Sequence, residues 1–177
     1  MANIVFNIAK GRVAELYDRV KSNDPANSAI ILVPIETSGL ESDATLIDAD
    51  TLAAVLAGTT NEQSTMGRKT LTDSDLASIP APDDGNDRND RSLPTVTWTA
   101  ASGSAISKIL VCYDSDTTSG TDSDIVPMTM FDFAQTPSRS RRARPCRWAW
   151  RVLAMRWRRW SPLLQLSRLC PSPRPSR

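Results

Sequence analysis

Charge is distributed so unevenly along this chain of 177 residues that it divides the chain into two unlike segments. Residues 1–137 contain all 20 Asp and Glu but only 9 Lys and Arg, a formal net charge of −11. Residues 138–177 contain 12 Arg, no Lys and no acid, a charge of +12. Such asymmetry indicates either a functional basic tail or two segments of different origin. We therefore expect one small acidic domain over 1–137 and a basic stretch, 138–177, outside that fold.

The first amphipathic pattern of the acidic segment predicts a helix over residues 8–22. Its apolar residues follow the i, i+3, i+4, i+7 spacing of one helix face: Val13, Leu16, Tyr17 and Val20. Phe6 and Ala9 can extend this stripe. Because the stripe is narrow, we expect the helix to lie on a sheet or on another subunit. The four residues of the stripe are therefore candidates for binding a partner.

Apolar runs further along predict strands. Residues 28–36 form a continuous β-branched run, typical of a strand buried on both faces, with Pro34 placing its second half at an edge or a bulge. Trp98, which lies in the first of the alternating later strands, is expected in a core or an interface and is a fifth candidate for partner binding. The remaining predicted strands cover residues 68–72, 94–100, 105–113 and 125–133.

Two short helices complete the predicted elements. Residues 51–57 combine a possible N-cap at Asp50 with Gly58 at the C′ position. A capping-box pattern over Thr72–Asp75 opens one further helical turn. The predicted fold class is therefore α+β, with the N-terminal helix packed on a small, mainly antiparallel sheet or sandwich. The Arg-, Trp- and Pro-rich C-terminal tail is expected to be non-globular.

Three interpretations compete for residues 138–177. As a nucleic-acid-binding arm, the stretch would pair phosphates with Arg and stack bases on Trp, with these candidates: Arg141, Arg142, Arg144, Trp157, Arg158, Arg159 and Trp160. A membrane-surface helix over 147–160 is disfavoured because its arginines fall on both sides of the helix. Out-of-frame translation of GC-rich DNA is the interpretation that the composition favours, since Lys, Asn, Ile, Phe and Tyr are all missing.

The residues that commonly carry catalysis are scarce. The chain contains no His, which excludes Ser–His and Cys–His pairs. Its glycines form no phosphate-binding loop, and three scattered cysteines predict neither a zinc site nor a disulfide framework. Cys112, inside an apolar run, is expected to be a buried, inert thiol. We therefore expect a protein that is not an enzyme and has no cofactor.

Two Asp-rich stretches, residues 83–90 and 114–124, leave calcium binding open. The EF-hand pattern fails in the second, because Ser119 stands where Gly is needed and Ile125 where Glu is needed. A solvated loop is the simpler interpretation of both stretches. No run approaches the ~20 apolar residues of a membrane span, and the N-terminus lacks the pattern of a signal peptide, so no membrane association is predicted.

The acidic segment resembles small virion proteins encoded among the head and tail genes of tailed bacteriophages. The resemblance covers about residues 1–136 and is carried by these segments: residues 1–35, Leu71–Leu76, Ala81–Arg88, Leu110–Asp114, Ile125–Met128 and Phe131–Phe133. It implies a structural role in the virion, with other virion proteins or copies of itself as partners, and the host cytoplasm as the place of assembly. It also implies one more strand after Pro137, without which the 125–133 strand would be left as an unpaired edge.

Overall fold

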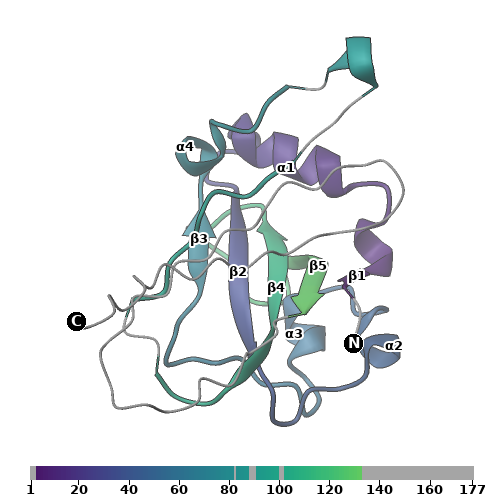
Figure 1. Ribbon diagram of the computed structural model, residues 1–177, viewed down its shortest axis with the longest axis vertical. Helices are drawn as coiled ribbons and strands as arrows, with labels where there is room; N and C mark the ends of the chain where they lie inside the picture. The colour runs from purple at the N-terminus through teal and green to yellow at the C-terminus, as the bar shows by residue number, and fades with distance from the viewer. Residues whose placement is uncertain (1–2, 82, 88–90, 100–101, 133–177) are drawn as a thin grey trace, which may run out of the picture.

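The computed structural model describes residues 3–81, 83–87, 91–99 and 102–132. These residues form an antiparallel five-stranded sheet in the order β1-β5-β4-β2-β3 (Figure 1). The strands are β1 (Ile4–Val5), β2 (Ala29–Glu36), β3 (Lys69–Leu71), β4 (Ile106–Asp114) and β5 (Val126–Asp132). The helical elements are η1 (Asn7–Ala9), α1 (Val13–Lys21), α2 (Asp43–Leu46), α3 (Leu52–Val55), α4 (Asp73–Leu76) and η2 (Asp84–Asn86). The predicted α+β class, with a helix packed on an antiparallel sheet, is confirmed for this part of the chain.

The two long strands β2 and β4 form the centre of the sheet and pair along their whole length. Residues 29–35 of β2 are buried, as expected for a strand covered on both faces. Pro34 fits into this strand because its backbone carbonyl points away from β4. It points to the side of β3, whose pairing with β2 ends at Leu32. There its carbonyl accepts a hydrogen bond from the Gln63 amide at 2.8 Å, and the missing N–H breaks no bond of the ladder. Of the two predicted alternatives, the edge was wrong, because residues 61–63 pair beside this half of β2, and the bulge is present as a register shift between Ile35 and Glu36.

One face of the sheet, which we call the α1 face, is covered by α1, α4 and the segment 91–98. The four apolar residues of the α1 stripe are buried there, at 3% exposure or less, against strands β2, β4 and β5. Figure 1 shows α1 and α4 beside each other across one end of the sheet. The expectation that the first helix lies on a sheet is therefore confirmed.

The opposite face, which we call the α3 face, is covered by two single-turn helices, α2 and α3, together with Phe6. Its core contains Leu46, Leu52 and Val55 from the covering layer, packed on the alternate residues of β2, β4 and β5. Figure 1 shows α2 and α3 grouped together, away from α1. The helix α2 was not predicted: its four residues show no helical period, and, unlike the equally short α3 and α4, no capping pattern was assigned to it.

The first helix begins later than the sequence predicts. Gly11 adopts a φ of +79°, a left-handed conformation that separates η1 from α1, so the helix covers Val13–Lys21 rather than 8–22. Ala9 joins the α1-face core as expected. The prediction that Phe6 extends the helix stripe was wrong, because Phe6 lies in the core of the α3 face.

The predicted strand over 94–100 was also wrong. No strand forms in the described part of this range, residues 94–99. The alternation arises because Val96 and Trp98 point into the α1-face core while their neighbours are more exposed. A segment that crosses a core in extended form buries every second side chain whether or not it joins a ladder.

The caps of the short helices match the sequence only in part. The capping box at Thr72 and Asp75 is present. Helix α3, however, is capped by the Thr51 hydroxyl, which accepts from the Ala54 amide, and not by Asp50. Gly58 is not a left-handed C′ residue. It faces the Glu41 carboxylate, which a Cβ at position 58 would approach to 2.4 Å, so a larger residue there would require the Glu41 side chain to move.

Strand β5 is not left as an unpaired edge. It pairs with β4 on one side and with β1 on the other, where Ile4 is opposite Met130 and Val5 is opposite Thr129. The expectation of an open edge at 125–133 was therefore wrong, because the first residues of the chain close it. A further strand after Pro137 would lie outside the described residues.

Candidate functional site

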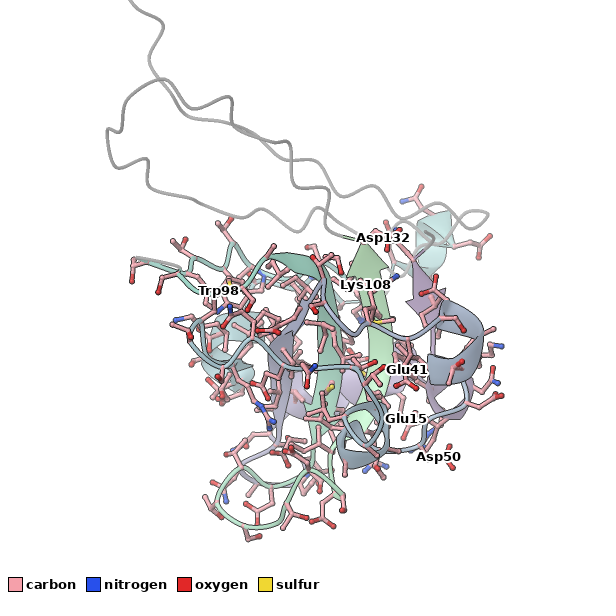
Figure 2. All side chains as sticks on the ribbon, turned by 90° about the horizontal axis from the view of Figure 1, so that it is seen from below. Glu15, Glu41, Asp50, Trp98, Lys108 and Asp132 are labelled. Carbon is pink, nitrogen blue, oxygen red and sulfur yellow. The ribbon has the colours of Figure 1, made fainter. Side chains whose placement is uncertain are left out.

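Lys108 is the most deeply buried charged group among the described residues, with a side-chain exposure of 0%. Its ammonium group lies 2.6 Å from the carboxylate of Asp132, directly opposite on β5, and 2.9 Å from that of Asp43 at the start of α2. Figure 2 shows Lys108 and Asp132 beside each other at one end of the sheet. Two carboxylates are what a buried cation needs, because an unpaired charge there would cost several kcal/mol. The cluster joins β4, β5 and α2.

Arg68 forms a second cluster, which joins two loops. Its guanidinium donates to both oxygens of Glu62, at 2.7 to 3.0 Å, and to both oxygens of Asp122, at 2.6 and 2.9 Å. The hydrogen bonds that Arg68 donates to Asp122 and Glu62 raise the pKa of Arg68, and the contact with Arg68 lowers the pKa of Asp122. The arginine thus ties the β4–β5 loop to the segment that precedes β3.

Arg91 fixes the covering layer of the α1 face. Its side chain is 1% exposed and donates to both carboxylate oxygens of Asp18 on α1, at 2.7 and 2.8 Å. It also donates to the carbonyl of Pro80 at 3.3 Å. Arg68, Arg91 and Lys108 are therefore used inside the fold. The sequence did not reveal these roles, since the acidic partners lie up to 73 positions away along the chain.

The exposed charges of the described surface are mostly negative. The exposed basic residues are Lys10, Arg12 and Arg19, and the last two lie within 3.5 Å of Glu15. The exposed acidic residues are Glu15, Asp24, Asp48, Asp50, Asp73, Asp75, Asp83, Asp84, Asp87 and Asp124. In the described part of residues 1–137, the excess of acidic over basic side chains is thus exposed at the surface and is not neutralised within the fold.

The acidic loop between β4 and β5 uses its carboxylates to shape its own backbone. Asp116 accepts hydrogen bonds from the amide and hydroxyl of Thr118 and from the Ser119 hydroxyl, which lower the pKa of Asp116. Asp124 accepts from the amide of Thr121 at 2.8 Å. Among the described residues, no group of three or more His, Cys, Asp or Glu is arranged to hold a metal ion. The second Asp stretch, 83–90, is described only to residue 87.

The residues predicted to bind a partner all lie in the core of the α1 face. The helix stripe is buried there, and burial raises the pKa of the Tyr17 hydroxyl. Trp98 is 5% exposed, and its indole N–H donates to the Gly67 carbonyl at 2.9 Å. These side chains are packed within the chain itself, so a partner reaching them would have to displace part of the fold. Their proposed contact with a partner stays a prediction.

Two further expectations concern single groups and elements. Cys112 is buried and not in a disulfide, which confirms its expected burial, and burial raises the pKa of its thiol, as expected for an unreactive cysteine. Within the described part of the chain, no helix has the length and apolar character needed to cross a membrane. The seven candidate nucleic-acid-binding residues, Arg141 to Trp160, lie outside the described residues.

Comparisons with known proteins identify no relative of this chain. No family model, no curated protein and no solved structure matches this chain.

Proposed function

We propose that residues 1–137 are a structural component of a tailed-bacteriophage virion, a minor capsid, decoration or head–tail protein. It acts through contacts with other virion proteins or with copies of itself, in the virion and, during assembly, in the host cytoplasm. The resemblance of residues 1–136 to small virion proteins motivates this assignment. One observation carries it: the exposed charge is mostly acidic, whereas Arg68, Arg91 and Lys108 are bound to carboxylates of the same chain.

Such a surface favours basic protein partners over nucleic acid. Phosphate would be repelled by the exposed carboxylates, whereas a basic protein surface would be attracted and oriented by them. Charge complementarity of this kind mainly raises association rates and suppresses wrong partners. A protein that carries out no chemistry and docks on a shell needs these two properties. Binding should therefore weaken as the salt concentration rises.

Mass spectrometry of purified phage particles tests the assignment. Cleavage after Arg91 and Lys108 releases the peptide 92–108, which contains Trp98 and reports the acidic domain. Cleavage after Lys108 and Arg139 releases the peptide 109–139, which crosses the boundary at Pro137. We expect the first peptide in particles at a constant ratio to the major shell protein. Particles with infectivity but without any peptide from 1–137 would contradict the proposal.

The alternative is a nucleic-acid-binding protein that uses the basic stretch, and its 12 Arg without a single acid are the observation in its favour. Filter binding should then fall steeply with salt and disappear when residues 138–177 are deleted. The DNA sequence around codon 137 separates the two proposals. If a shifted frame there encodes a Gly- and Thr-rich strand, the stretch is out-of-frame translation and the alternative is lost.

A further inference from the structure

The edge of the sheet beside β5 is closed by a very short strand from the N-terminus. β1 has two residues, whereas β5 has seven. The pairing is extended at both ends: the Phe6 amide donates to the Met128 carbonyl at 3.0 Å, and the Asp132 amide donates to the Asn3 side chain at 2.9 Å. Residues 3–6 therefore cover the outer edge of β5 from Met128 to Asp132. This short segment is all that pairs with that edge among the described residues.

One side chain anchors this segment. Phe6 is fully buried, at 0% exposure, in the core of the α3 face. The helix α1, which begins seven positions later, packs on the opposite face, where it meets Ala9 from the end of this segment. Phe6 and α1 thus hold opposite faces of the sheet. We call residues 3–9 the N-terminal strap; its last residues are held at the Asn7 amide, which donates to the Ile47 carbonyl at 2.9 Å.

The connection from the strap to α1 lies outside the core, although its backbone is hydrogen-bonded to the strap: the Arg12 amide donates to the Ala9 carbonyl at 2.9 Å and the Lys10 amide to the Asn7 carbonyl at 3.3 Å. Lys10, Gly11 and Arg12 are all exposed. Gly11 has a left-handed backbone, and a Cβ at that position would meet nothing within 4 Å. No core packing at Gly11 therefore holds the strap to its own copy of the chain. If this connection extended, the strap would reach the β5 edge of a second copy and make the same contacts there.

We propose that the outer edge of β5, with the Phe6 pocket beside it, is a strand-acceptor site that takes the N-terminal strap of a second copy of this chain. Two copies exchange straps reciprocally around a twofold axis, and each contributes Phe6 and β1 to the other. The closed and exchanged forms share the contacts of the strap with β5 and with the α3-face core, but the exchanged form gives up the hydrogen bonds from Lys10 and Arg12 to the strap. Protein concentration sets the ratio of the two forms. The proposed function gives copies of this chain as one kind of partner, and this proposal rests on it because it says how two copies would bind. Its test needs no phage particle, so it can fail while the virion assignment stands.

Cysteines introduced at positions 5 and 129 report where the strap lies. Val5 and Thr129 are directly opposite. Because the Phe6 amide bonds to β5, Val5 occupies a non-hydrogen-bonded pair, whose Cα atoms are about 4.5 Å apart, a separation that a disulfide can span. The Thr129 hydroxyl has no hydrogen-bond partner in the described part of the chain, so replacing it removes none. Cys146→Ser and Cys170→Ser remove the two cysteines of the basic stretch, which leaves only the buried Cys112 besides the introduced thiols.

The experiment mixes two full-length single variants in that background, Val5→Cys labelled with ¹⁵N and Thr129→Cys unlabelled, at high concentration before oxidation. Strap exchange predicts a disulfide that joins the labelled peptide containing position 5 to the unlabelled peptide containing position 129. The double variant Val5→Cys/Thr129→Cys must form the same bond, which shows that both substitutions leave β1 on β5. Absence of the mixed pair, with the bond present in the double variant, overturns the proposal. Absence of the bond in both overturns it as well, because β5 then accepts no strap.

Deleting Lys10 and Gly11 gives a second, independent readout. A shortened connection can no longer reach its own β5 edge but can still reach a neighbour's, so we expect the molar mass from light scattering to double. The matched control inserts two Gly residues after Gly11, which should leave the chain monomeric. A shortened variant that stays monomeric and folded would contradict strap exchange.

Discussion

The two faces of the sheet are covered by different kinds of structure. The α1 face is covered mainly by one nine-residue helix, whose apolar stripe follows the helical period in the sequence, together with the single-turn α4 and residues 91–98. The α3 face is covered by Phe6 and two four-residue helices, and it contains the buried Lys108 cluster. One face thus relies on a regular helix, the other on short segments joined by an ion cluster. The comparison shows that apolar side chains can be buried as completely under four-residue helices as under a nine-residue helix.

The largest effect is expected at Lys108, where the α3 face depends on a buried charge. Lys108→Ala removes the cation between two carboxylates, so we expect a loss of about 3–5 kcal/mol in the free energy of unfolding by urea. Lys108→Met, which keeps the aliphatic stem, should lose less. Arg91→Ala is the counterpart on the α1 face. It should lose less than Lys108→Ala because its partner Asp18 is 47% exposed and stays solvated. A loss at Lys108 below about 1 kcal/mol would show that the cluster does not support this face.

The two apolar layers should contribute to one cooperative unit. Leu16→Ala on α1 and Leu52→Ala on α3 each remove a buried side chain, and each should cost about 2–5 kcal/mol. Because the two residues lie on opposite faces, their effects should add to within about 0.5 kcal/mol. Urea unfolding of the single and double variants measures this. If Leu52→Ala left the free energy unchanged, the α3 face would be a loose covering rather than a second core.

The N-caps of the short helices provide a matched pair. Thr51→Ala removes the cap of α3, and Thr72→Ala removes the capping box of α4 on the other face. Each should cost about 1 kcal/mol. Serine at either position, which keeps the hydroxyl, should restore most of the loss. A cap effect confined to one face would mean that the other short helix is held by packing alone.

The smallest effect concerns pH. Arg68 lowers the pKa of Asp122, so this carboxylate is charged more readily in the folded chain than in the unfolded chain, where its pKa is about 3.9. Its stabilisation is present above pH ~3.9 and is lost as the pH falls through the folded value. Asp122→Asn should therefore lower stability at pH 7, by less than about 1 kcal/mol because the side chain is 37% exposed. The difference from the unmodified chain should vanish in strong acid. A difference that grows on acidification would exclude this cause.

The sequence predicted the α1 face better than the α3 face for a physical reason. The period of Val13, Leu16, Tyr17 and Val20 spans more than one turn, so it predicts both a helix and the side that it buries. Single-turn helices show no period, so they are predicted only where a capping pattern marks them, as for α3 and α4, and α2 was missed. The pairing of Lys108 with Asp43 depends on positions 65 apart, which only the folded topology brings together. The 94–100 segment showed the reverse, where alternation was present without a ladder.

The central claim is that residues 3–132 form a two-faced domain that does not need residues 138–177. A chain ending at Pro137 contains a single tryptophan, Trp98, which is buried on the α1 face. Urea unfolding of this chain, followed by Trp98 fluorescence, tests the claim most directly. We predict one cooperative transition in which the emission shifts to the red, with the same midpoint as the circular dichroism of the full chain. Emission typical of exposed tryptophan in the absence of urea, without a transition, would contradict the account.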